Sequence, residues 1–179
     1  FTTREAEAEE YIKASARIKE LTGVAPKGFR SPAWEFSKYT PDILVEMGII
    51  YSSNMMHTEK IHQLEVFGEK KKLIEVPIHW AMDDAAYWLY STKIMGKAMQ
   101  PLDAVEQVFT RWFDVIYDEF KNVPGREDTV YVLTGHPQVI GLPPRAVVLD
   151  NVIKHIEKFD DVEFIKMGDL AERYIDLIK

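Results

Sequence analysis

Short apolar segments alternate with helical segments along this chain of 179 residues, and that alternation restricts the possible folds more than any other feature. Strands are expected near residues 27–31, 49–53, 73–80, 128–137 and 162–168, with a weaker one at 64–67. Helices are expected before, between and after them. This order is typical of a mostly parallel sheet covered by helices, because parallel strands need long crossover connections. The predicted fold class is therefore α/β.

The helical segments are predicted from apolar residues at helical spacing and from their ends. The first is expected over residues 4–22, with Ile18 and Leu21 on its buried face and Gly23 as its stop. A long helix is expected from about Pro101. Its apolar face recurs at spacings of four, three, four and four residues: Val105, Phe109, Trp112, Ile116 and Phe120. Further helices are expected at 41–48, from 143 and at 169–179.

The charge balance and residue content argue against several classes of function. A net charge of −7 argues against nucleic acid or an anionic membrane surface as the main partner. The absence of cysteine excludes a disulfide scaffold and a thiolate metal site. No apolar run approaches membrane-spanning length. The sequence leaves the cellular location open, with a cytoplasmic one favoured. The basic run at residues 70–72 is interpreted as a solvated turn.

Polar and aromatic side chains gather where three of the expected strands end. Arg30 and Trp34 follow the first strand, Asp83 and Asp84 follow the segment that ends in His79-Trp80, and His136 follows the strand at 128–137. The carboxyl ends of parallel strands share one edge of a sheet, where ligands bind in α/β folds. If the strands run parallel, these groups therefore lie on one face.

Each of these residues also has a simpler structural interpretation. An arginine after a strand is often a surface ion-pair partner, and tryptophans near loops more often pack at a rim. Asp83 and Asp84 would suit the start of a short helix at 85–90. A lone histidine is more often structural, and we place His57, His62, His79 and His155 in that class.

Taken together, the same residue types describe a plausible hydrolytic site. Histidine can give a proton to a leaving amine near neutral pH, and an adjacent aspartate would hold its tautomer. In the segment Gly135-His136-Pro137, the proline stiffens the loop and fixes the direction of the histidine. The combination predicts that His136 acts as an acid in hydrolysis.

Three motifs, RSPAW (30–34), EVPIHWAMDD (75–84) and LTGHPQVIG (133–141), resemble the carboxyl-terminal part of the NodB-homology polysaccharide deacetylases, carbohydrate esterase family 4. The resemblance is strongest to the branch with peptidoglycan deacetylase-like proteins, PuuE allantoinase-like proteins and cyclic imide hydrolases. It covers nearly the whole chain. It implies the later part of a distorted barrel with seven βα units, and the hydrolysis of an amide.

The resemblance also implies roles for individual residues. Arg30 would orient the general base, His136 would be the general acid, and either Asp83 or Asp84 would support it. Trp34 and Trp80 would line the substrate pocket. The full set of expected substrate-binding residues is Pro32, Trp34, Trp80, Met82 and Pro137. A divalent metal, usually zinc, would be held by residues outside this chain, which carries neither the TFDD-like motif nor the H-x-x-x-H motif of the family.

Two further departures from the family concern this chain directly. YSSN (51–54) stands where the family has YDSS, and GLPPR (141–145) stands where it more often has GRPSR. We expect residues 1–179 to form a single domain that is completed by the amino-terminal part of the barrel, missing or on a separate chain. A homo-oligomer is also expected, because oligomers are common in this branch.

The expected function is hydrolysis of a carbon–nitrogen amide bond, most simply metal-dependent de-N-acetylation of a polysaccharide or peptidoglycan, with activity only when the amino-terminal part is present. One alternative is an amidohydrolase that acts on allantoin or a cyclic imide. Another is a non-catalytic module that binds carbohydrate or a protein partner, with the tryptophans as stacking surfaces. The sequence leaves the substrate open.

Overall fold

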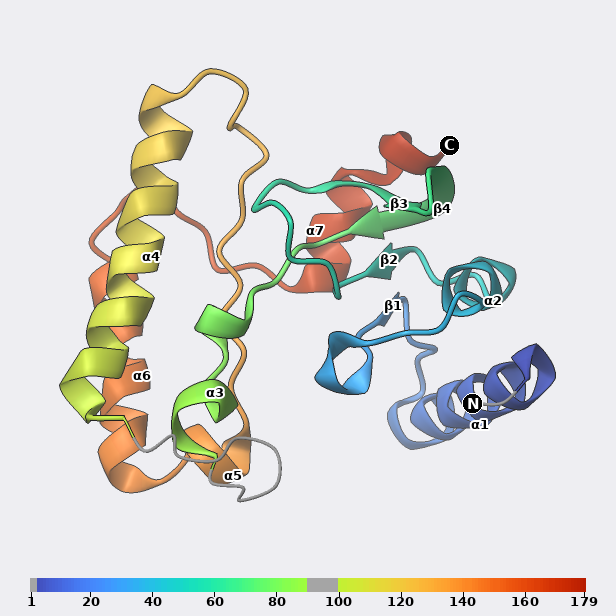
Figure 1. The fold of residues 1–179 in the computed structure, drawn as a ribbon, viewed down its shortest axis with the longest axis horizontal. Coiled ribbons are helices and arrows are strands. Elements are labelled where there is room, and N and C mark those ends of the chain that lie inside the picture. The colour runs from blue at the N-terminus through green and yellow to red at the C-terminus, as the bar shows by residue number, and fades with distance from the viewer. Residues whose placement is uncertain (1–2, 90–99) are drawn as a thin grey trace. The chain divides into compact units, whose positions relative to one another are not determined.

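The computed structural model describes residues 3–89 and 100–179, and the chain divides into two compact units (Figure 1). The first unit comprises Phe1–Met55, Ile61–Pro77 and Ile165–Lys179. The second comprises Met56–Lys60 and Ile78–Phe164. Each unit is described by itself. The expectation that residues 1–179 form a single domain stays a prediction.

The first unit is built on a four-stranded sheet with the order β1-β2-β4-β3 (Figure 1). Its strands are β1 (Gly28–Phe29), β2 (Tyr51–Ser52), β3 (His62–Val66) and β4 (Glu69–Glu75). Strands β1, β2 and β4 run parallel, and only β3 is antiparallel to its neighbour. The parallel pairing predicted for the segments at 27–31, 49–53 and 73–80 is therefore confirmed for these three strands.

Strands β3 and β4 form a hairpin that corrects one prediction. The turn lies at Phe67 and Gly68, a two-residue connection of the kind that joins antiparallel strands. The basic run Lys70–Lys72, which we expected to be a solvated turn, lies in β4 instead. Lys71 is half-buried there and forms ion pairs of 2.9 Å with Asp42 and Glu69, which compensate its charge.

Helix α1 (Arg4–Thr22) has the bounds expected from the sequence. The hydroxyl of Thr3 accepts a hydrogen bond from the Ala6 amide at its start, and Gly23 ends it with a φ of 78°. The expected buried face is wrong in its second half, since Ile18 and Leu21 are exposed.

The other helical elements of the first unit are short. They are η1 (Pro32–Trp34), α2 (Thr40–Glu46), α7 (Met167–Arg173) and η3 (Ile175–Ile178). The core of the unit joins α2 to the sheet through Leu44, Ile49, Leu64 and Leu73. Leu64 of β3 and Leu73 of β4 thus anchor the sheet in this core, while β2 and β4 end in the polar residues Ser52 and Glu75.

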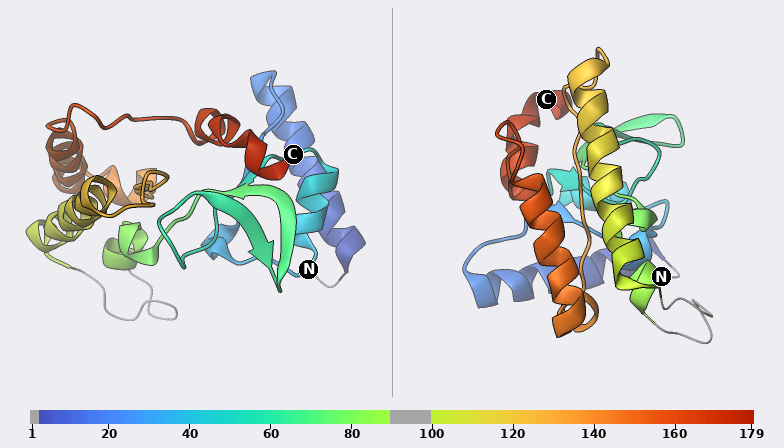
Figure 2. Two further views of the ribbon diagram at one scale, coloured as in Figure 1. Left: turned by 90° about the horizontal axis from the view of Figure 1, so that it is seen from above. Right: turned by 90° about the vertical axis from the view of Figure 1, so that its left-hand side faces the viewer.

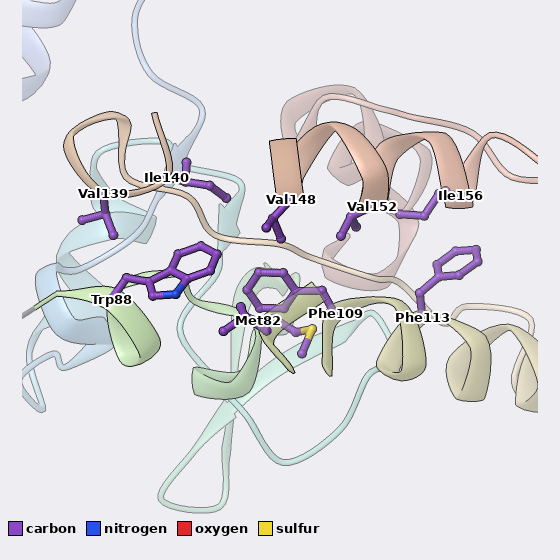
Figure 3. Packing of buried hydrophobic residues seen from close by; sticks show 10 residues of the cluster. Met82, Trp88, Phe109, Phe113, Val139, Ile140, Val148, Val152 and Ile156 are labelled. Atoms are coloured by element: carbon purple, nitrogen blue, oxygen red, sulfur yellow. The ribbon is translucent and has the colours of Figure 1, made fainter. Parts of the chain in front are cut away.

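The second unit is mostly helical. Its elements are η2 (Trp80–Met82), α3 (Ala85–Trp88), α4 (Leu102–Asn122), α5 (Pro137–Ile140) and α6 (Pro143–Ile156). The long helices α4 and α6 lie side by side (Figure 2). Buried residues of both pack with residues of α3 and α5 in one core, which includes Trp88, Phe109, Val139 and Val152 (Figure 3). This core fixes the short helices that carry the candidate site.

Two predicted strands are wrong. In the segment 128–137 only Thr129 and Thr134 form bridges, with Lys60 and Asp83 respectively, and the described residues between them form no ladder. The segment 162–168 has no strand either, and its end belongs to α7. An apolar pattern indicates burial, whereas a strand also requires a neighbour that pairs with its backbone along its length.

None of the helices in the described ranges is both long and apolar enough to cross a membrane.

Candidate functional site

The second unit brings His136 against Asp84. His136 precedes α5, and Asp84 precedes α3. The Nδ1 atom of His136 lies 2.6 Å from Oδ1 of Asp84, and the backbone amide of His136 donates to Oδ2 of the same carboxylate at 2.9 Å. Asp84 is fully buried. One carboxylate therefore holds both the main chain and the ring of the histidine.

A short backbone pairing between two distant segments creates this contact. The amide of Thr134 donates to the Met82 carbonyl at 2.7 Å, and the amide of Asp84 donates to the Thr134 carbonyl at 3.1 Å. These bonds form the parallel bridge between Thr134 and Asp83. They set the register in which Asp84 faces His136.

Asp83 lies close to the pair but binds elsewhere. Its Oδ1 accepts a hydrogen bond from the Ala85 amide at 2.7 Å, at the start of α3, and lies 3.7 Å from Nδ1 of His136. Burial raises the pKa of the Asp83 carboxyl, and the amide bond and His136 offset only part of that effect. The sequence left open which aspartate contacts His136, and in the structure it is Asp84.

The hydrogen bond to Asp84 determines which ring nitrogen of His136 is available. When the Asp84 carboxylate is ionised it can only accept hydrogen bonds, and Nδ1 of His136 is then the donor in this contact. Among the described residues, none is hydrogen-bonded to Nε2. The His136 side chain is 38% exposed. The arrangement therefore suits a proton transfer at Nε2, while the contact of Nδ1 with Asp84 holds the orientation of the ring.

Asp83, Asp84 and His136 each offer a ligand atom within 4.8 Å of the others, which is close enough for a shared cation. Their arrangement does not fit a metal centre. Nδ1 of His136 and Oδ1 of Asp84 face each other at 2.6 Å, a hydrogen-bond distance. The other Asp84 oxygen accepts from an amide, and so does Oδ1 of Asp83. A cation would have to displace this network.

Arg30 lies in the first unit, where β1 ends. Its Nη2 donates to the Ser53 hydroxyl at 2.8 Å and its Nε to the Ser53 carbonyl at 3.3 Å. Nη2 also contacts the sulfur of Met167 at 3.6 Å. The guanidinium is thus held at two points by the residue that follows β2.

The YSSN segment is hydrogen-bonded around Asn54. Its Oδ1 accepts from the Ser31 amide at 2.8 Å, and its Nδ2 donates to the Ser52 hydroxyl at 2.9 Å. The backbone amide of Asn54 donates to Oε1 of Glu75 at 2.6 Å. Asn54 therefore joins the ends of β1, β2 and β4. The sequence marked this segment only as a departure from the family, and two of the partners of Asn54, Glu75 and Ser31, are 21 and 23 residues away.

Glu75 is fully buried at the end of β4. Its Oε1 also accepts from the Met55 amide at 2.8 Å, while Oε2 has no hydrogen-bond partner among the described residues. Burial raises the pKa of its carboxyl, an effect that the hydrogen bonds from Met55, Ser52 and Asn54 only partly oppose. Sequence reasoning missed Glu75, although a glutamate inside an apolar strand is an unusual signal.

The expected substrate-binding residues differ in exposure. Trp80 is 41% exposed, and Pro32 and Pro137 are exposed. Trp34 is 7% exposed and Met82 is 2% exposed. Met82 belongs to the core of the second unit, which favours a packing role for it. Contact of any of these five residues with a substrate stays a prediction.

The turn that carries Trp34 has an uncommon backbone. Ala33 and Trp34 have φ values of 53° and 59°, in the left-handed region. A bulky residue there is strained, and the surrounding structure must hold it. Backbone bonds from Trp34 to Ser31 at 3.0 Å and from Glu35 to Pro32 at 3.4 Å close the turn.

The chain is similar in sequence to known peptidoglycan deacetylase and deacetylase-like proteins. No family model matches the chain. It is 27% identical to a peptidoglycan deacetylase of Helicobacter pylori, over 97% of this chain and 65% of that protein. It is 20% identical to the peptidoglycan deacetylase-like protein FGM2 of Gibberella zeae, over 91% of this chain and 55% of that protein. The chain thus spans about 55–65% of the length of these curated relatives.

Solved structures show the same relationship. A protein from Mycobacterium smegmatis described as a polysaccharide deacetylase matches with a TM-score of 0.83 and 26% identity, over 96% of this chain and 57% of its own. PuuE allantoinase matches with a TM-score of 0.80 and 20% identity, over 97% of this chain and 54% of its own. These likenesses confirm the resemblance to NodB-type deacetylases and the α/β fold of part of such a barrel.

Proposed function

We propose that this chain, as the later part of a NodB-type barrel, supplies the general acid of an amide hydrolase that de-N-acetylates a polysaccharide of the peptidoglycan type. The observation that carries the proposal is the two-point bonding of His136 by the buried Asp84 carboxylate. The similarity to the Helicobacter pylori peptidoglycan deacetylase supports the substrate class.

In this proposal His136 transfers a proton through Nε2 to the leaving nitrogen of the amide. Asp84 keeps the other proton on Nδ1 and stabilises the imidazolium before the transfer. The hydrogen bond from the His136 backbone amide to Asp84 keeps the backbone at His136, and with it the ring, in one position. Asp83 holds the start of α3 through its bond to Ala85 and does not contact the substrate.

Arg30 is proposed to orient a general base that lies outside this chain. Ser53 fixes the guanidinium of Arg30 at two points, which favours a role in orienting another group over that of a mobile surface charge. Trp80 is proposed to provide a surface for a sugar ring, because it is large and 41% exposed.

The remaining components are proposed to come from outside this chain. A divalent metal, zinc in the simplest case, would activate the attacking water. Because Asp83, Asp84 and His136 do not fit a metal centre, its ligands are assigned to the amino-terminal part of the barrel. That part is also the proposed partner, and homo-oligomers of the completed protein are expected.

The test is the replacement His136→Ala in the complete protein, assayed on an N-acetylated glycan. If His136 is the acid, kcat should fall by about 10²–10⁴-fold. His155→Ala is the matched control, because His155 also contacts an aspartate at 2.6 Å in the second unit. Equal rates for the His136 and His155 variants, or an unchanged rate for the former, would reject the acid role.

A substrate panel separates the alternatives. Release of acetate from the glycan supports the deacetylase, whereas hydrolysis of allantoin or a cyclic imide without acetate release would assign the site to an amidohydrolase. Glycan binding with no turnover of any panel member would indicate a binding module. Assays with and without a chelator test the metal.

A further inference from the structure

The guanidinium of Arg145 contacts two elements that carry the candidate site. Arg145 lies in the first turn of α6, and its Nη1 donates to the Val139 carbonyl at 3.1 Å. Its guanidinium carbon lies 5.4 Å from the centre of the Trp88 ring, within the range of a cation–π contact. Arg145 is the last residue of the GLPPR segment. We call Arg145, Val139 and Trp88 the arginine clamp.

Val139 connects the clamp to His136. The amides of Val139 and Ile140 both donate to the His136 carbonyl, at 2.8 and 2.9 Å. Helix α5 is a single turn, so these bonds make up most of its internal support. A force on the Val139 carbonyl therefore reaches the His136 backbone through one hydrogen-bonded turn.

Trp88 connects the clamp to Asp84 in the same way. The amide of Trp88 donates to the Asp84 carbonyl at 3.0 Å, across the single turn of α3. Trp88 is 3% exposed and packs in the same core as Val139, and Figure 3 shows the two side chains next to each other. Two one-turn helices thus hold His136 and Asp84, and each meets the Arg145 guanidinium one turn away.

The connection from α5 to α6 is tight. The Gly141 amide donates to the Pro137 carbonyl at 3.1 Å, and a Cβ atom at Gly141 would lie 2.2 Å from that oxygen. The next residue, Leu142, is 49% exposed. The close approach at Gly141 brings Arg145 back over α5, so that its guanidinium reaches the Val139 carbonyl.

We propose that Arg145 is a positioning residue, which keeps His136 aligned with Asp84 by clamping α5 and α3 to the start of α6. The inference rests on the proposed role of His136 as the acid. Arginine suits this role because its planar guanidinium donates to the Val139 carbonyl while its charge lies over the Trp88 ring. The ammonium of lysine is a compact point charge and reproduces only part of this geometry.

The experiment compares Arg145→Gln and Arg145→Lys with the parent in the complete protein. One readout is the NMR signal of the hydrogen-bonded Nδ1 proton of His136, which reports the 2.6 Å contact without turnover. We expect Arg145→Gln to lose this signal and to lower kcat by about 10²-fold with little change in KM. Arg145→Lys should restore part of both.

Lys154→Gln is the matched control, because it removes a cation from the same helix whose ammonium pairs with Asp150, one turn away on the surface. It should keep the signal and the rate. An intact Nδ1 signal in Arg145→Gln would overturn the clamp, even if the variant melts earlier. If Arg145→Gln does not fold, Arg145→Lys decides: a weakened signal supports the clamp, and a parental signal and kcat reject it.

The outcomes also separate the clamp from the proposed function. A lost Nδ1 signal in Arg145→Gln, combined with a fully active His136→Ala variant, would leave the clamp standing and reject His136 as the acid. An intact signal in Arg145→Gln, combined with an inactive His136→Ala variant, would reject the clamp alone.

Discussion

Two histidine–aspartate pairs in the second unit have the same 2.6 Å contact and different surroundings. His155 of α6 contacts Asp114 of α4 through Nε2, and the two side chains are 27% and 38% exposed. His136 contacts a fully buried Asp84 through Nδ1, and its backbone amide binds the same carboxylate.

The difference lies in what each pair holds in place. His155 joins two long helices and packs its ring against Phe113 and Phe159, at centroid distances of 6.1 and 5.8 Å. The pair therefore ties secondary structure together. The Asp84 pair instead joins the starts of two one-turn helices and directs Nε2 of His136 away from its anchor. The contact distance alone does not separate a structural pair from a candidate catalytic one.

The largest expected effect comes from changing the aspartate of each pair to asparagine. In Asp84→Asn an amide replaces the acceptor of the His136 Nδ1 proton, so the ring loses its orientation and its countercharge. We expect kcat to fall by about 10²-fold or more in the complete protein. Asp114→Asn should leave kcat unchanged. A similar loss of kcat in both variants would show that the two histidine–aspartate pairs do not differ in function.

A smaller effect is expected on stability. His155→Ala removes a hydrogen bond and ring contacts between α4 and α6, and should lower the free energy of unfolding by about 1–2 kcal/mol. Urea denaturation of the complete protein measures this change, and kcat should stay at the parental value. A fall in kcat at unchanged stability would place His155 in the reaction and contradict the distinction.

Among changes to the residues around His136, the smallest effect on rate is expected for Asp83→Asn. Asparagine can still accept the hydrogen bond from the Ala85 amide, and Asp84 still binds His136. The rate should stay within about tenfold of the parent. The pH dependence of stability gives a separate signature. Burial raises the pKa of the Asp83 carboxyl above its ordinary value of 3.8, so the folded state holds this proton more tightly than the unfolded state.

As the pH rises from below 3.8, the unfolded chain releases that proton first, and the parental free energy of unfolding falls until the pH passes the raised pKa of the folded state. Asp83→Asn lacks this titration. Its stability relative to the parent should therefore increase across that window and then level off. A difference that is constant with pH would contradict the raised pKa.

Helices were predictable where their ends carry local signals. Helix α1 has its expected bounds, because Gly23 ends it in the left-handed conformation. Helix α4 follows Pro101, as its apolar spacing indicated. The expected strand at 128–137 failed for a non-local reason. Its backbone pairs only near Thr129 and Thr134, and no local pattern reveals whether a partner strand is present.

The candidate site also combines features that local sequence signals predict with features that depend on non-local contacts. His136 and the aspartate pair stood out because their types and order suit acid catalysis, but the choice of Asp84 depends on the bridge between Thr134 and Asp83. Asn54 was missed as a connector because its bond to the Ser31 amide depends on the parallel register of β1 and β2. Arg145 was named only as part of a variant motif.

The close approach at Gly141 implies unequal tolerance to mutation in two adjacent codons. Any side chain at 141 would collide with the Pro137 carbonyl, whereas Leu142 projects half into solvent. During evolutionary drift, position 142 can therefore sample many residue types while position 141 stays invariant. Saturation libraries of this turn should show a sharp boundary between a forbidden site and a permissive one.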